Sequence, residues 1–165
     1  PLAAGNTWTY RCSAEGRFQF TKKVVIASME TVDGQLAYRS EMRVGTDPTP
    51  LVNYLIVDRG GRIMTSATPT PTLDKAELLM SSAPKIGDRF GKFSVVARAP
   101  STLKKYQKTE TISLENFSAD DPNVSEAKRM EWLGRSYGKG IGLLEEADGL
   151  GGACVLSAYK VKAMK

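Results

Sequence analysis

The sequence contains no histidine, and this absence narrows the chemistry that the chain can perform. Without an imidazole, the chain can build neither a Ser-His-Asp or Cys-His nucleophile nor a histidine-based metal site. An enzyme of this composition would have to rely on carboxylates, lysine, tyrosine or serine, which is the less favoured alternative. We therefore expect a protein that is not an enzyme and that uses neither a metal nor another cofactor.

Long apolar runs are also absent. No segment reaches the roughly 18 consecutive apolar residues from which a transmembrane helix is inferred. Hydrophobic residues make up 41% and charged residues 25% of the 165 residues, which is ordinary globular usage and argues against disorder. We predict one β-rich domain over residues 1–165 that does not itself cross a membrane.

Cysteine is scarce as well, because the chain has only Cys12 and Cys154, near its opposite ends. No C-x-x-C spacing or cysteine–histidine cluster accompanies them, which argues against zinc and thioredoxin chemistry. Two interpretations stay open. The pair could form a disulfide that ties the first strand to the last, as would fit an exported protein, or both could be buried thiols.

Basic residues outnumber acidic ones by 23 to 18, and the excess is unevenly distributed. Segment 85–108 has seven basic residues against one acidic, whereas 110–148 has nine acidic against four basic. We interpret these segments as pairing within the fold; the alternative is a surface for anionic lipid, polysaccharide or nucleic acid. Lys104, Lys105 and Lys108 surround Tyr106, a pattern that also occurs in nucleic-acid-binding strands. The simpler explanation is that these lysines prevent an edge strand from pairing with another chain. Nucleic acid is therefore not an expected partner.

What is present is a series of short segments in which apolar and polar residues alternate, separated by Gly, Pro and Asp. The segments 6–12 and 17–31 are examples, and Asp33-Gly34 is typical of a two-residue hairpin turn. This pattern predicts a mostly β fold with a single curved antiparallel sheet, either a half-barrel or an open barrel. One short helix or helical turn is expected around residues 73–81. We also expect strands over 104–114 and, despite good helix formers, over 125–133.

Glycines cluster between Gly134 and Gly142, around Lys139. The spacing does not fit a phosphate-binding loop, which needs four residues between its glycines and a Ser or Thr after the lysine. We interpret the cluster as a bulge or a strand crossing beside a bulky partner. Glu145 and Glu146 follow it, and because neighbours in a strand point to opposite faces, we do not expect them to share a site.

Three motifs span nearly the whole chain: PLAAGNTWTY at 1–10, IGDRF at 86–90 and YGKGIGLLEE at 137–146. Together they resemble a family of bacterial envelope proteins and lipoproteins of unknown function, with the pattern PLxxGNxWxY, GDxF and YxKGxGLxxE. The resemblance implies an exported β-rich domain, in the periplasm or at the outer membrane, anchored by a lipid on a segment upstream of Pro1. The family supplies no catalytic residues. A more distant resemblance in fold is to the lipoprotein-localisation factors, whose curved sheet surrounds a hydrophobic concavity.

A curved sheet with one apolar face must cover that face with a helix, a loop or a ligand. We therefore predict a non-catalytic envelope protein with a binding or scaffolding role, which could hold a lipid or another apolar molecule in the concave face. The candidate lining residues are apolar or aromatic and come from several segments: Trp8, Tyr10, Phe18, Phe20, Tyr54, Ile56 and Trp132. The alternatives are that these residues simply form the packed core, or that the chain is an interaction module for an envelope protein partner.

Overall fold

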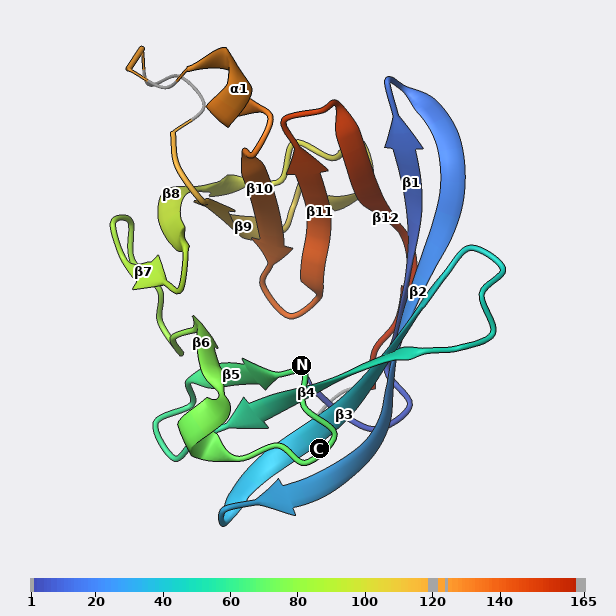
Figure 1. The fold of residues 1–165 in the computed structure, drawn as a ribbon, viewed down its shortest axis with the longest axis vertical. Helices are drawn as coiled ribbons and strands as arrows, with labels where there is room; N and C mark the ends of the chain where they lie inside the picture. Colours follow the sequence, from blue (N-terminus) through green and yellow to red (C-terminus); the bar gives the residue numbers. More distant parts are fainter. Residues whose placement is uncertain (1, 119–121, 124, 163–165) are drawn as a thin grey trace. The chain divides into compact units, whose positions relative to one another are not determined.

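The fold is described from a computed structural model, which covers residues 2–118, 122–123 and 125–162. Pro1, the first residue of the N-terminal motif, lies outside the described residues. The mostly β class is confirmed (Figure 1). Twelve strands form one sheet in the order β6-β5-β4-β3-β2-β1-β12-β11-β10-β9-β8-β7. Neighbouring strands pair antiparallel from β2 to β6 and from β7 to β12. The strands are β1 Thr7–Ala14, β2 Arg17–Val32, β3 Gln35–Val44, β4 Leu51–Val57, β5 Ile63–Ser66, β6 Glu77–Met80, β7 Arg89–Phe90, β8 Phe93–Pro100, β9 Glu110–Glu115, β10 Leu133–Gly138, β11 Gly142–Asp148 and β12 Gly152–Lys160.

The contacts divide the chain into two compact units. Among the described residues, unit 1 comprises 2–10, 21–84 and 157–162, and unit 2 comprises 11–20, 85–118, 122–123 and 125–156. Strands β1, β2 and β12 contribute residues to both.

Unit 1 is built on the β2–β3 hairpin that the sequence predicts. Asp33 and Gly34 both have positive φ, 49° and 74°, and Val32 pairs with Gln35 across the turn. These angles match the primed turn that suits the right-handed twist of paired strands. The predicted hairpin is therefore confirmed.

One core of unit 1 lies on the face of β3 and β4 that carries Tyr54 and Ile56. Their side chains are buried with Val32 and Ala37, and Leu73 and Ala76 pack against this cluster. Residues 73–75 form a single 3₁₀ turn, whose Leu73 N–H donates to the Asp33 carboxylate at 2.9 Å. The helical turn expected around 73–81 is thus present, although it ends at Lys75 and gives way to strand β6.

The two ends of the chain meet in unit 1. The Ile26 N–H donates to the carbonyl of Asn6, and the Gly5 N–H donates to the carbonyl of Ile26. From the C-terminal side, Ser157 Oγ donates to the Thr9 carbonyl at 2.9 Å and the Lys162 N–H donates to Asn6 Oδ1 at 2.9 Å. Asn6 is completely buried, so its side chain is a structural link between the termini rather than a surface group.

Unit 2 contains β7 to β11 with the parts of β1, β2 and β12 that adjoin them (Figure 1). Its buried apolar side chains come from nearly every strand: Cys12, Phe90, Phe93, Val95, Leu114, Leu144 and Leu156. Tyr106 adds to them from the connection between β8 and β9, and its hydroxyl donates to the Leu156 carbonyl at 3.5 Å.

Two predicted strands are wrong in part, both in unit 2. Residues 104–106 form a 3₁₀ turn, and β9 begins only at Glu110. Lys104, Tyr106 and Lys108 therefore do not share a strand face, because burial of the Tyr106 ring turns the chain inward there. Residues 126–129 form the short helix α1 instead of a strand, because Ser125 caps it by accepting from the Lys128 N–H.

The two cysteines, both in unit 2, are joined: Cys12 and Cys154 form a disulfide across a sequence separation of 142 residues. Of the two interpretations that the sequence leaves open, the structure contains the bonded one. Among the described residues, no helix has the length and apolar character needed to cross a membrane.

Candidate functional site

Unit 2 contains a shallow pocket of about 210 Å³ on one face of β9, β10 and β11. We call it the Trp132 pocket. Its lining residues come from these three strands and from the residue that precedes β10: Ser113, Leu114, Glu115, Trp132, Gly134, Arg135, Ser136, Glu145 and Ala147. The polar residues among them are two serines, two glutamates and Arg135.

Strand register places the polar residues of the pocket in one row. Ser136 on β10 pairs with Ser113 on one side and with Glu145 on the other. Paired residues in antiparallel strands have Cβ atoms roughly 4.5–5.5 Å apart on the same face. Two hydroxyls and one carboxylate therefore stand next to one another across three strands.

The neighbouring row leaves space in the sheet surface. Gly134 pairs with Glu115 on β9 and with Ala147 on β11, so two of the three positions have little or no side chain. The Trp132 indole occupies the space above Gly134. A Cβ atom at position 134 would lie 2.5 Å from Cη2 and 2.6 Å from Cζ2 of this ring. Only glycine leaves room for the indole at this height above the sheet.

Hydrogen bonds fix the backbone on both sides of Trp132. The Trp132 N–H donates to the Arg129 carbonyl at 3.1 Å, and its carbonyl accepts from the Gly149 N–H at 2.9 Å. Asn116 holds the adjacent residues, since its Nδ2 donates to the Glu131 carbonyl at 2.8 Å and its Oδ1 accepts from the Leu133 N–H at 2.9 Å. The aromatic wall of the pocket is therefore held in place by the backbone around it.

The indole itself has an unsatisfied donor. Trp132 Nε1 is buried and, within the described part of the chain, has no hydrogen-bond partner. A buried donor without a partner costs about 1–3 kcal/mol. The ring therefore keeps its position above Gly134 although its unpaired Nε1–H costs free energy. Proteins retain local conflicts of this kind at functional sites.

The carboxylates of the pocket have no compensating cation. Within the described residues, neither Glu115 nor Glu145 makes an ion pair or a side-chain hydrogen bond. Arg89 lies in the same row as Glu115, with Ser94 between them, but it is exposed on the edge strand β7. The pocket is therefore an anionic surface beside an aromatic ring.

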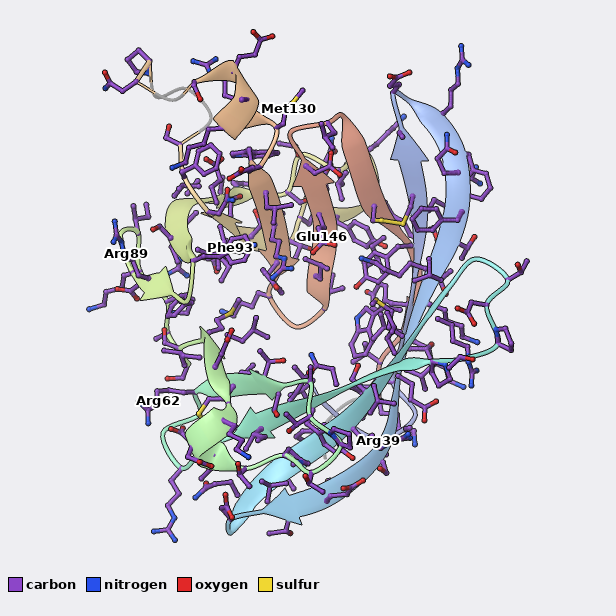
Figure 2. The ribbon with its side chains drawn as sticks, viewed as in Figure 1. Arg39, Arg62, Arg89, Phe93, Met130 and Glu146 are labelled. Atoms are coloured by element: carbon purple, nitrogen blue, oxygen red, sulfur yellow. A yellow bond between two sulfur atoms is a disulfide. The ribbon has the colours of Figure 1, made fainter. Side chains whose placement is uncertain are left out.

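The side chain of Arg135 lies on the opposite face of β10. Its Nε donates to the Glu146 carboxylate at 2.8 Å, and its guanidinium lies 4.6 Å from the centre of the Phe93 ring. Figure 2 labels Glu146 on β11, which pairs directly with β10, and Phe93 on β8, which is separated from β10 by β9. On this face burial raises the pKa of Tyr137, the nearby Arg135 charge opposes that rise, and Glu146 adds to it. Glu145 and Glu146 thus serve different faces, as the alternation of side chains predicts.

The seven residues predicted to line an apolar site fall into distinct surroundings. Trp8 and Tyr10 are buried in unit 1, and Tyr54 and Ile56 belong to the unit 1 cluster described above. Phe18 and Phe20 are exposed on β2 in unit 2, at 54% and 38%. Trp132 alone among the seven lines the pocket described here.

The other pocket residues are not apparent from the sequence by itself. Ser113, Ser136 and Glu145 come from three strands whose mutual register no local pattern specifies. The usable signal is the alternation in segments 112–115 and 133–136, which separates the two faces of β9 and β10. Among the described residues, no group of three or more acidic or cysteine side chains has the arrangement of a metal site.

No protein-family model matches the sequence, and no curated protein matches it. Among solved structures, the chain is similar to a crystal structure from Bacteroides fragilis described as a "putative exported protein with YmcC-like fold". The two chains are 10% identical, with a TM-score of 0.56 over 98% of each. At this identity the likeness shows a shared fold, and the envelope family that the motifs resemble stays a prediction.

Proposed function

We propose that this protein is an exported, non-catalytic binding domain of the bacterial envelope and that it binds a ligand in the Trp132 pocket. The observation that carries the proposal is the held position of Trp132 above Gly134, beside polar groups that have no partners in the described structure. A fixed aromatic ring next to unpartnered hydroxyls and carboxylates is the arrangement expected of a prepared binding surface.

Two observations support export. The Cys12–Cys154 disulfide is the kind of bond that persists in an oxidising compartment such as the periplasm. The structural neighbour from Bacteroides fragilis is described as a "putative exported protein". A periplasmic or outer-membrane location with an upstream lipid anchor is what the resemblance of the sequence motifs to envelope proteins implies.

The side chains available in the pocket support a non-catalytic role. Neither Ser113 nor Ser136 can have a histidine base, because the chain contains none.

The experiment that tests binding uses the two indole N–H signals of the ¹⁵N-labelled protein. A Trp132→Phe variant assigns the Trp132 signal, and Trp8 serves as the internal control. A panel of small neutral, anionic and cationic compounds should contain members that shift the Trp132 signal in a saturable way and leave the Trp8 signal in place. A panel that moves neither signal, or that moves both together, would contradict the proposal.

The sequence also predicts that the protein holds a lipid or another apolar molecule. Native mass spectrometry of protein purified from bacterial membranes tests this version directly. A bound lipid of defined mass that is lost on mild activation would support it. Protein that carries no additional mass would contradict the lipid version.

A second candidate function, an interaction module for an envelope protein, is favoured by the hairpin of β1 and β2. Phe18 and Phe20 are both exposed on its β2 arm, and the Arg11 guanidinium lies 5.0 Å from the centre of the Phe18 ring. Exposed aromatics beside arginine are common in protein interfaces. Site-specific photocrosslinking from position 18 in living cells should give a discrete adduct if this function is correct, and none if it is not.

A further inference from the structure

The charge of the Trp132 pocket points to a particular class of ligand. Glu115 and Glu145 stand on β9 and β11, on either side of β10, and neither has a cationic partner in the described part of the chain. Arg135, the basic residue of the adjoining strand β10, is held on the opposite face by Glu146 and Phe93. A ligand that brings positive charge would therefore meet an uncompensated negative surface.

The aromatic wall narrows the class further. An indole attracts cations over its face, and the planar guanidinium both stacks on aromatic rings and donates to carboxylates as a fork. Ser113 and Ser136 offer hydroxyl oxygens as additional acceptors in the row that ends at Glu145. A guanidinium has five N–H donors and no acceptor atom. It can therefore donate to these hydroxyl oxygens and to the carboxylate, and it brings no acceptor that would need a donor from the pocket.

The size of the pocket indicates how such a group arrives. About 210 Å³ is below the roughly 300–1,000 Å³ of sites that enclose a complete small molecule. The pocket is also open along the sheet face, so it suits one head group of a ligand whose remainder stays outside. An arginine side chain projecting from an extended polypeptide has this shape.

On the basis of the proposed binding function, we infer that the Trp132 pocket receives an arginine side chain of a partner polypeptide. The guanidinium lies against the Trp132 indole and donates to the Glu145 carboxylate, with Ser113, Ser136 and Glu115 completing the surroundings. The partner is thus a protein that presents an arginine on an exposed segment, and the contact is electrostatic as well as aromatic.

The test compares two probes that differ in charge and have nearly the same shape. N-acetyl-arginine methylamide carries the guanidinium, and N-acetyl-citrulline methylamide replaces it with a neutral urea group. We expect the arginine probe to shift the Trp132 indole signal saturably and the citrulline probe to bind about tenfold more weakly, because only the former makes charge-assisted hydrogen bonds. Added salt should lower the affinity for the arginine probe and leave the affinity for the citrulline probe unchanged.

A matched pair of variants locates the charge. Glu145→Gln should lower the affinity for the arginine probe about five- to tenfold and should not change the affinity for the citrulline probe. Glu77→Gln, an exposed position in unit 1, changes the net charge by the same amount and should have no effect. Unchanged circular dichroism and thermal unfolding of both variants would show that the fold is intact.

The outcomes separate this inference from the function on which it rests. Equal affinity for both probes, or an unchanged affinity in Glu145→Gln, would overturn the arginine inference. If neutral compounds shift the Trp132 signal and the arginine probe does not, the pocket binds ligands but the arginine inference is wrong. If no compound moves it, both proposals fail.

Discussion

Trp132 lies directly over Gly134, two residues further along the chain, at a height where a Cβ atom would come within 2.5 Å of the ring. The substitution Gly134→Ala should therefore displace the indole from the sheet face. We expect a loss of about 1–3 kcal/mol in the free energy of unfolding, as for other overpacked sites, together with a red shift of the Trp132 fluorescence. Urea unfolding followed by fluorescence measures both.

Gly60→Ala is the matched control for that substitution. A Cβ at position 60 would meet only the Asp58 carboxylate, at 3.3 Å, which is the end of a flexible side chain. This variant should unfold close to the wild type. Equal stability of Gly134→Ala and Gly60→Ala would show that the indole is free to move and that the pocket wall is not fixed.

Asn116 supports the same ring from a distance. Asn116→Ala removes the hydrogen bonds to the Glu131 carbonyl and the Leu133 N–H. We expect it to cost about 1–3 kcal/mol and to broaden or split the Trp132 indole signal, because the backbone that orients the ring is released. The measurement is the ¹⁵N–¹H spectrum combined with thermal unfolding.

Asn53→Ala is the control, because it also removes a side-chain hydrogen bond. The Asn53 Nδ2 donates to Thr65 Oγ1 at 2.7 Å in unit 1. This variant should also lose stability, but the Trp132 signal should keep its position and width. If both variants change the Trp132 signal equally, Asn116 has no specific role in positioning the ring.

The local patterns of the sequence predict much of the fold because strand faces depend on neighbours two residues apart. The Asp33-Gly34 turn follows from residues that tolerate positive φ, and the opposite facing of Glu145 and Glu146 follows from alternation alone. The glycine cluster also behaves as predicted, since a bulge occurs between Ser136 and Tyr137, and Gly134 underlies a bulky indole.

The candidate site required information that local patterns do not contain. Ser113, Ser136 and Glu145 become neighbours only through the register of three strands. Segment 125–133 alternates like a strand, yet the Ser125 cap and the hydrogen bonds around Trp132 impose a helical turn instead. Capping by a serine is visible in the sequence, but the contacts of the following turn with Gly149 and Asn116 are not.

The disulfide should contribute a large part of the stability. Replacing Cys12 and Cys154 with alanine removes a crosslink between residues 142 positions apart. The chain-entropy relation for a loop of this length gives a loss of about 5 kcal/mol in the free energy of unfolding. Urea unfolding of the wild type with and without reductant, and of the double variant, measures the effect.

The same comparison includes its own control. Reductant should shift the midpoint of the wild type toward that of the Cys12→Ala/Cys154→Ala protein and should leave the double variant unchanged. A wild-type midpoint that is insensitive to reductant under unfolding conditions would mean that the bond contributes little to stability.

The β4–β5 connection contains an acid-sensitive turn. The Asp58 carboxylate accepts from the Arg62 N–H and the Gly60 N–H, each at 2.9 Å, and pairs with the Arg62 guanidinium at 2.6 Å. The hydrogen bond from the Arg62 backbone, followed by that from its side chain, lowers the pKa of Asp58 from its ordinary 3.8. Because the folded-state pKa is the lower one, the stabilisation is complete above the ordinary pKa and is lost as the pH falls through the folded value.

Asp58→Asn should therefore remove part of the acid sensitivity. The amide can still accept through its oxygen, but it carries no charge for Arg62 and does not titrate. We expect the variant to be less stable than the wild type at neutral pH and the difference to shrink steadily as the pH falls below 3.8. Thermal unfolding measured across this range checks the sign. A difference that stays constant, or grows toward acid, would mean that the carboxylate is not stabilised by Arg62 in the folded protein.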